Sequence, residues 1–80
     1  MAIYIGLKCI EKAEPLLTYR FFKADGTEYG VLVVDTSTAE ICLLSAVDER
    51  ASVFAFPRAC RAIQLRLKDG LLPDELCYAA

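Results

Sequence analysis

The chain lacks histidine and tryptophan, and its few glycines are scattered. Without histidine it cannot form a Ser-His-Asp triad, a Cys-His pair or an HExxH metal site. The isolated glycines exclude the GxGxxG and GxxxxGK[ST] phosphate-binding loops; they are Gly6, Gly26, Gly30 and Gly70. Two carboxylate pairs, Asp48-Glu49 and Asp74-Glu75, stand in polar connections, where such groups are solvated. We therefore expect a protein that is not an enzyme, with no catalytic residue and no cofactor.

Long apolar runs are also absent. Stretches such as Val31-Leu32-Val33-Val34 are only a few residues long, whereas a membrane-spanning helix needs about 20. The first residues, Met1 to Leu7, include neither a basic region nor a small-residue cleavage motif. We therefore expect no membrane segment, no secretory signal and a cytoplasmic protein of bacterial or phage style.

The four cysteines are far apart, with no C-x-x-C pair; they are Cys9, Cys42, Cys60 and Cys77. A reducing compartment disfavours structural disulfides, and each cysteine lies in or beside an apolar pattern. We expect them to serve as small buried hydrophobes and to bind no metal. Two disulfides, an all-cysteine metal site and a reactive thiol remain alternatives.

Apolar residues are what the chain has in excess. They make up 56% of its 80 residues, and the net charge is −2. This composition excludes a disordered chain and, by whole-chain charge, a generally basic nucleic-acid binder. A single domain of this size, residues 1–80, buries only about 60% of the surface that its unfolded chain exposes. The surplus therefore predicts a covering partner, and we expect a homodimer, the commonest symmetric oligomer.

The hydrophobic pattern predicts an α+β domain. Alternating residues predict strands at 2–10, 16–23, 28–35 and 39–46, and Asp25-Gly26 predicts a hairpin between the second and third. Pro57 and Gly70 bracket an amphipathic helix at 57–69, while 51–56 fits either a helical turn or an extended piece. The result is a four-stranded, mainly antiparallel sheet in the order β-β-β-β-α, with the first strand at an edge and a short C-terminal tail.

The outer face of the helix holds one candidate interface. A projection of 100° per residue places Phe56, Ala59, Cys60, Ile63 and Leu67 on the core side. Leu65 then lies directly opposite, flanked by Arg58 and Arg61. An apolar anchor ringed by arginines is a composition favoured at interfaces, although a single exposed leucine also needs no explanation.

The sheet holds a second candidate interface, because its first and third strands are apolar on both sides. In the third strand Tyr29, Val31 and Val33 face one way, and Leu32 and Val34 the other. One helix covers one face, so we expect a second copy, or the C-terminal segment folded back, to cover the other. The candidate interface residues here are Tyr4, Tyr29, Leu32 and Val34.

Taken together, these patterns predict a non-catalytic protein–protein interaction module of the inhibitor, immunity or adaptor type. One alternative is a regulator that contacts nucleic acid through the basic helix 58–68, since residues 50–68 carry five basic groups and no acid. The other, a small enzyme or ligand carrier, would require a deep pocket containing Asp35, Glu40 or a cysteine.

Overall fold

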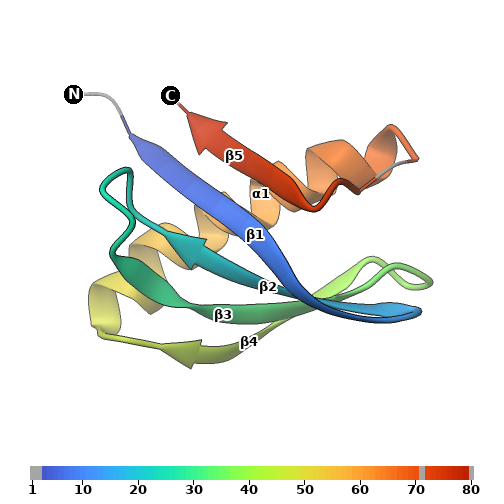
Figure 1. Cartoon of the computed structure of the whole chain (residues 1–80), viewed down its shortest axis with the longest axis horizontal. Helices are drawn as coiled ribbons and strands as arrows, with labels where there is room; N and C mark the ends of the chain where they lie inside the picture. Colours follow the sequence, from blue (N-terminus) through green and yellow to red (C-terminus); the bar gives the residue numbers. More distant parts are fainter. Residues whose placement is uncertain (1–2, 71, 80) are drawn as a thin grey trace.

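The computed structural model describes residues 3–70 and 72–79, which form a five-stranded antiparallel sheet with one helical segment packed on it (Figure 1). In chain order the elements are β1 (Tyr4–Ala13), β2 (Leu16–Phe22), β3 (Glu28–Asp35), β4 (Glu40–Ala46), η1 (Ala51–Ala55), α1 (Phe56–Lys68) and β5 (Glu75–Ala79). The first four strands form a meander, and the strand order is β4-β3-β2-β1-β5. The helical segment therefore carries the chain across one face of the sheet, from the β4 edge to the β5 edge.

The α+β class and the antiparallel sheet are confirmed, but the number of strands is wrong. Residues 75–79, expected as part of a tail, form β5 and pair antiparallel with β1 from Lys8↔Glu75 to Tyr4↔Ala79. The first strand is consequently internal instead of at an edge. The alternation of Leu76 and Tyr78 was a signal for this strand, but five residues with few β-branched side chains acquire strand structure only from a distant partner.

The helical segment begins earlier than the sequence indicates. Asp48 Oδ1 accepts a 2.7 Å hydrogen bond from the Ala51 N–H, as a capping aspartate does. Residues 51–55 then form a single π-helical stretch, η1, before α1 starts at Phe56. Pro57 occupies the first turn of α1 and has no N–H to donate, so the helical hydrogen bonding changes from π to α where that donor is missing.

The core lies between small residues of the helix and large residues of the sheet. The helical side chains that face the sheet and are buried are mostly alanines: Ala51, Ala55, Ala59, Ala62 and Ile63. Opposite them the sheet supplies bulky, fully buried side chains, among them Tyr19, Phe21 and Leu32. Because a close-packed interior needs matched volumes, the alanines let the helix approach a sheet face that already carries aromatic rings.

One buried hydroxyl ties the segment before β5 to the middle of the sheet. Tyr19 on β2 is fully buried, and its hydroxyl donates a 2.6 Å hydrogen bond to the Pro73 carbonyl oxygen. Burial raises the pKa of this hydroxyl well above its ordinary value of 10.0, and nearby Cys9 and Asp74 raise it further. The neutral hydroxyl is therefore the form that the folded protein stabilises.

We expect Tyr19→Phe to lower the free energy of unfolding by about 1–2 kcal/mol, because the Pro73 carbonyl loses its donor while the ring stays packed. The raised pKa also predicts an alkaline effect. The stabilisation that the folded protein gains from keeping the Tyr19 proton is fully present below pH 10. It is lost as the pH rises above 10, at about 1.4 kcal/mol per pH unit, because only the unfolded state releases this proton.

Urea unfolding of the wild-type protein and the Tyr19→Phe variant between pH 8 and 11.5 measures both the loss of stability and its dependence on pH. The Tyr19→Phe variant is expected to lose the part of the alkaline slope that this proton contributes. Identical slopes in the two proteins would contradict the assignment of alkaline sensitivity to Tyr19.

Candidate interaction surfaces

The face of the sheet opposite the helix is not covered by any of the residues described. Strand register identifies its members, because residues paired across neighbouring strands point to the same face. One row runs across all five strands through Ser45, Val31, Arg20, Lys8 and Glu75. Neighbouring rows pass through Cys42, Val33, Thr18 and Glu11, and through Glu28, Phe22, Gly6 and Cys77. We call this surface the open face.

The charged residues of the open face lie mainly toward β1, β2 and β5 and balance one another. Arg20 Nη1 is 3.6 Å from Glu28 Oε1, and its guanidinium carbon is 5.1 Å from the centre of the Phe22 ring. Lys8 stands opposite Glu75 in the register of β1 and β5. This part of the open face is therefore amphipathic and close to neutral, which disfavours a phosphate-binding role.

The middle of the β3–β4 side of the open face is uncharged, with Glu28 at one end of β3 and the pair Asp35 and Glu40 at the other. Val31 and Val33 are half-buried, and Cys42 is exposed opposite Val33. A β-bulge between β3 and β4 makes Leu44 an extra residue, because Val31 pairs with Ser45 while Leu32 pairs with Leu43. Leu44 is 57% exposed. We call Val31, Val33, Cys42 and Leu44 the β4 patch.

Three of the residues predicted to form an interface are buried instead. Leu32 and Val34 are fully buried beneath the helix, so their expected accessibility to a partner is wrong. Tyr29 is also buried because a bulge between β2 and β3 makes it an extra residue, turned inward with its ring 6.2 Å from that of Phe21. Alternation correctly separated Val31 and Val33 from Leu32 and Val34, but it does not say which set a helix covers.

The C-terminal segment was one of two expected covers for the second face, and it does not act as one. The part described, β5, extends the sheet at its edge (Figure 1). Of the two alternatives, a second copy therefore remains as the expectation.

The predicted interface residues of the helix differ in how exposed their side chains are. Leu65 is 54% exposed, opposite the core as expected, and Arg61 is exposed. Arg58 is half-buried and turns back along the helix: its Nη1 donates a 2.9 Å hydrogen bond to the Phe54 carbonyl, and its guanidinium carbon lies 4.0 Å from the centre of the Phe54 ring. The expected ring of arginines around Leu65 is therefore incomplete.

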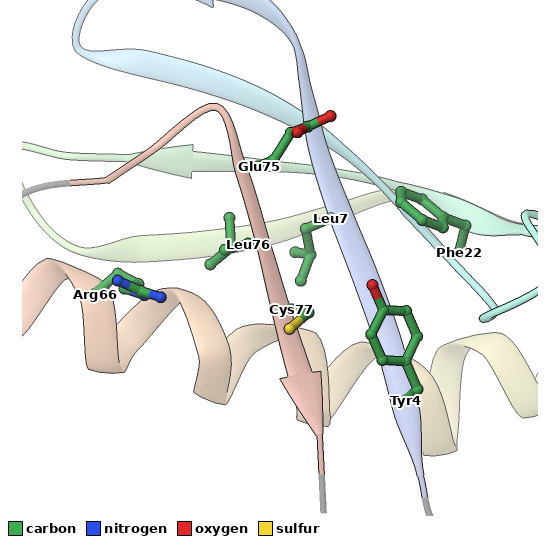
Figure 2. A pocket seen from close by; sticks show the side chains of 7 residues that line it. All are labelled: Tyr4, Leu7, Phe22, Arg66, Glu75, Leu76 and Cys77. Atoms are coloured by element: carbon green, nitrogen blue, oxygen red, sulfur yellow. The ribbon is translucent and has the colours of Figure 1, made fainter.

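Another basic residue of segment 58–68, Arg66, lies at a cavity that Arg58 does not line. Arg66 lines a cavity of about 340 Å³ at the β1–β5 side, together with Tyr4, Phe22 and Cys77 (Figure 2). Phe22 is paired with Gly6, and its ring occupies the space that a Cβ at Gly6 would need. Tyr4, another predicted interface residue, is 43% exposed.

The cysteines divide into two pairs by exposure, and all four are free thiols. Cys9 and Cys60 are half-buried, and burial raises the pKa of the Cys60 thiol. Cys42 and Cys77 are exposed on the open face, so the expectation that all four are buried is wrong. Residues 3–70 and 72–79 contain no cluster of cysteine and carboxylate side chains that could hold a metal ion.

Asp35, the candidate general base, is used by the turn that follows β3. Its Oδ1 accepts hydrogen bonds from the Ser37 hydroxyl and, at 2.9 Å, from the Ser37 N–H. These bonds lower the pKa of Asp35, the hydroxyl contributing most. A carboxylate stabilised in its charged form is a weak base, and this turn is the Asx-type structure that the sequence predicts.

No helix among the residues described is long and apolar enough to cross a membrane. Comparisons with protein-family models, curated proteins and solved structures gave no match to this chain.

Proposed function

We propose that this chain is a non-catalytic interaction module and that β4 pairs antiparallel with β4 of a second copy. The observation that carries the proposal is the chemistry of the β4 edge. From Ile41 to Val47 the chain has no charged residue, and β4 is the outermost strand of the sheet. An edge strand presents unpaired N–H and C=O groups, and natural proteins usually protect such an edge with lysine, proline or a covering element.

The β5 edge, at the other side of the sheet, is better protected than the β4 edge. Both strands begin with a glutamate, Glu75 on β5 and Glu40 on β4, but β5 spans only five residues and has α1 packed against it. On β4, by comparison, the outward-lying residues Cys42, Leu44 and Ser45 are exposed and uncharged. A partner strand would satisfy the free backbone groups of β4 and cover apolar side chains at the same time.

Pairing along the edge is favoured over stacking two open faces. Stacking would bury Lys8, Arg20 and Glu28, and removing such charges from water costs several kcal/mol unless they are well paired. Edge pairing leaves these residues in solvent. It brings together the β4 patches of the two copies, and half-buried Ile41 and Leu43 on the helix side of β4 gain cover as well.

A second copy is the partner that fits this edge best. Two identical strands related by a two-fold axis are antiparallel, and their uncharged segments from Ile41 to Ala46 would lie against each other. The two sheets would join as one continuous sheet of ten strands, twice the five of a single copy.

Hydrogen exchange measured at several protein concentrations tests this proposal. We expect the outward N–H groups of β4 to exchange more slowly as concentration rises, because pairing with a second strand protects them. The amides of β5 serve as the internal control and should not change. Exchange in β4 that is independent of concentration, in a sample that sediments as a monomer at high micromolar concentration, would refute self-pairing.

A further inference from the structure

A second cavity, of about 400 Å³, lies between the start of η1, the beginning of β1 and the β2–β3 hairpin. Its lining includes two cationic residues, Lys23 and Arg50, two aromatic residues, Tyr29 and Phe54, and Ile3, Tyr4 and Ala24. Small-molecule sites commonly have this size and this composition, an apolar lining with a few convergent polar groups. The cavity is separate from the β4 patch, so what it binds is independent of the self-pairing proposed above.

The cations at this cavity are held in place by the rings. The Arg50 guanidinium carbon lies 4.4 Å from the centre of the Phe54 ring, and Lys23 Nζ lies 5.5 Å from the centre of the Tyr29 ring. Arg58 stacks on the same Phe54 ring at 4.0 Å. Residues 50, 54 and 58 recur every four positions, so one helical face places the ring between two guanidinium groups.

These three cations are not neutralised by the protein. Within the described ranges, Lys23, Arg50 and Arg58 have no carboxylate oxygen within 4 Å, since the two ion pairs found there are Lys12–Asp74 and Arg20–Glu28. The carboxylates of Asp25 and Asp48, which are near in the sequence, keep their charge and accept hydrogen bonds from the N–H groups of Thr27 and Ala51. The cavity therefore combines an apolar lining with two cationic side chains that form no ion pair among the residues described.

We propose that this cavity binds a small planar anion, an aromatic ring system that carries one phosphate or carboxylate group. The ring would lie against the edges of Tyr29 and Phe54, because the two guanidinium groups already occupy the faces of the Phe54 ring. The anionic group would accept hydrogen bonds from Arg50 and Lys23, and a guanidinium can offer two parallel donors to either anion. A nucleoside monophosphate and an aromatic carboxylate share this chemistry.

Titration calorimetry with two matched pairs of compounds tests the proposal and distinguishes the two sources. The pairs are AMP with adenosine, and indole-3-acetate with indole-3-acetamide. We expect one anion of the two pairs, or both, to bind more tightly than its neutral counterpart. Arg50→Gln is expected to weaken anion binding about tenfold or more, as the loss of a hydrogen bond to a charged group does. Lys23→Gln is expected to act in the same direction.

The matched control is Arg61→Gln, which removes the same charge from an exposed position on α1 that does not line this cavity. It should leave the affinity within about twofold of the wild-type value at moderate salt, because charges beyond a Debye length are screened. Absence of binding by both anions, equal binding by the neutral compounds, or equal losses in the Arg50 and Arg61 variants would overturn the proposal.

Discussion

Gly30→Ala is expected to destabilise the protein by about 3 kcal/mol or more, the upper range for overpacking a closed interior. A Cβ at this position would lie 2.2 Å from the Ser45 carbonyl oxygen and 3.0 Å from the Ala46 Cα. Both atoms belong to the backbone of β4, so β3 and β4 would have to separate. For an 80-residue domain, whose total stability is about 4–12 kcal/mol, this loss would be a large share of the free energy of unfolding. Urea unfolding followed by circular dichroism measures the change.

Gly6→Ala provides the matched control, because both glycines are in strands of the same sheet. The Cβ at position 6 would approach the ring of Phe22, with 2.4 Å to Cε2. Phe22 is half-buried on the open face, so its side chain can turn aside. We therefore expect a smaller loss of stability than for Gly30→Ala. The reverse order would contradict the conclusion that the close approach of β3 and β4 depends on Gly30.

Leu44→Lys is expected to raise the dissociation constant of the proposed dimer by about 100-fold or more. The two-fold axis would bring two new ammonium groups to the same edge, and like charges juxtaposed in an interface cost several kcal/mol. Lysine is also the residue with which natural edge strands prevent pairing. The fold of the single copy should be unaffected, since Leu44 is an exposed bulge residue outside the core. Sedimentation velocity across a concentration series gives the constant.

The sequence was sufficient to predict the central strands and the helix. Residues 16–46 alternate strongly, and the strands predicted there agree with β2, β3 and β4 to within one residue at each end. The buried residues of β2 alternate along the strand, as expected of a strand with one covered face; they are Leu17, Tyr19 and Phe21. Such agreement is expected where each strand buries one face, because a slip of one residue would expose the whole apolar set.

The candidate surface could be predicted only in part, for reasons that involve distant contacts. Alternation shows that β3 has two apolar faces, but whether Val33 or Val34 is covered depends on where the helix crosses. Bulges added further error: the extra residue at Tyr29 is buried, and the extra residue at Leu44 is exposed. The cavity at Arg50 and Phe54 escaped prediction because residues 51–56 fitted two conformations equally well.

Sedimentation of the wild-type protein, compared with that of the Leu44→Lys and Leu65→Lys variants, tests pairing through β4 directly. These leucines are 57% and 54% exposed, one on β4 and the other on α1, so the two substitutions alter similar surfaces at different places. Pairing through β4 predicts that the wild-type protein and the Leu65 variant form dimers with similar dissociation constants, while the Leu44 variant sediments as a monomer. Dimers that survive Leu44→Lys but not Leu65→Lys would place the interface on the helix and contradict pairing through β4.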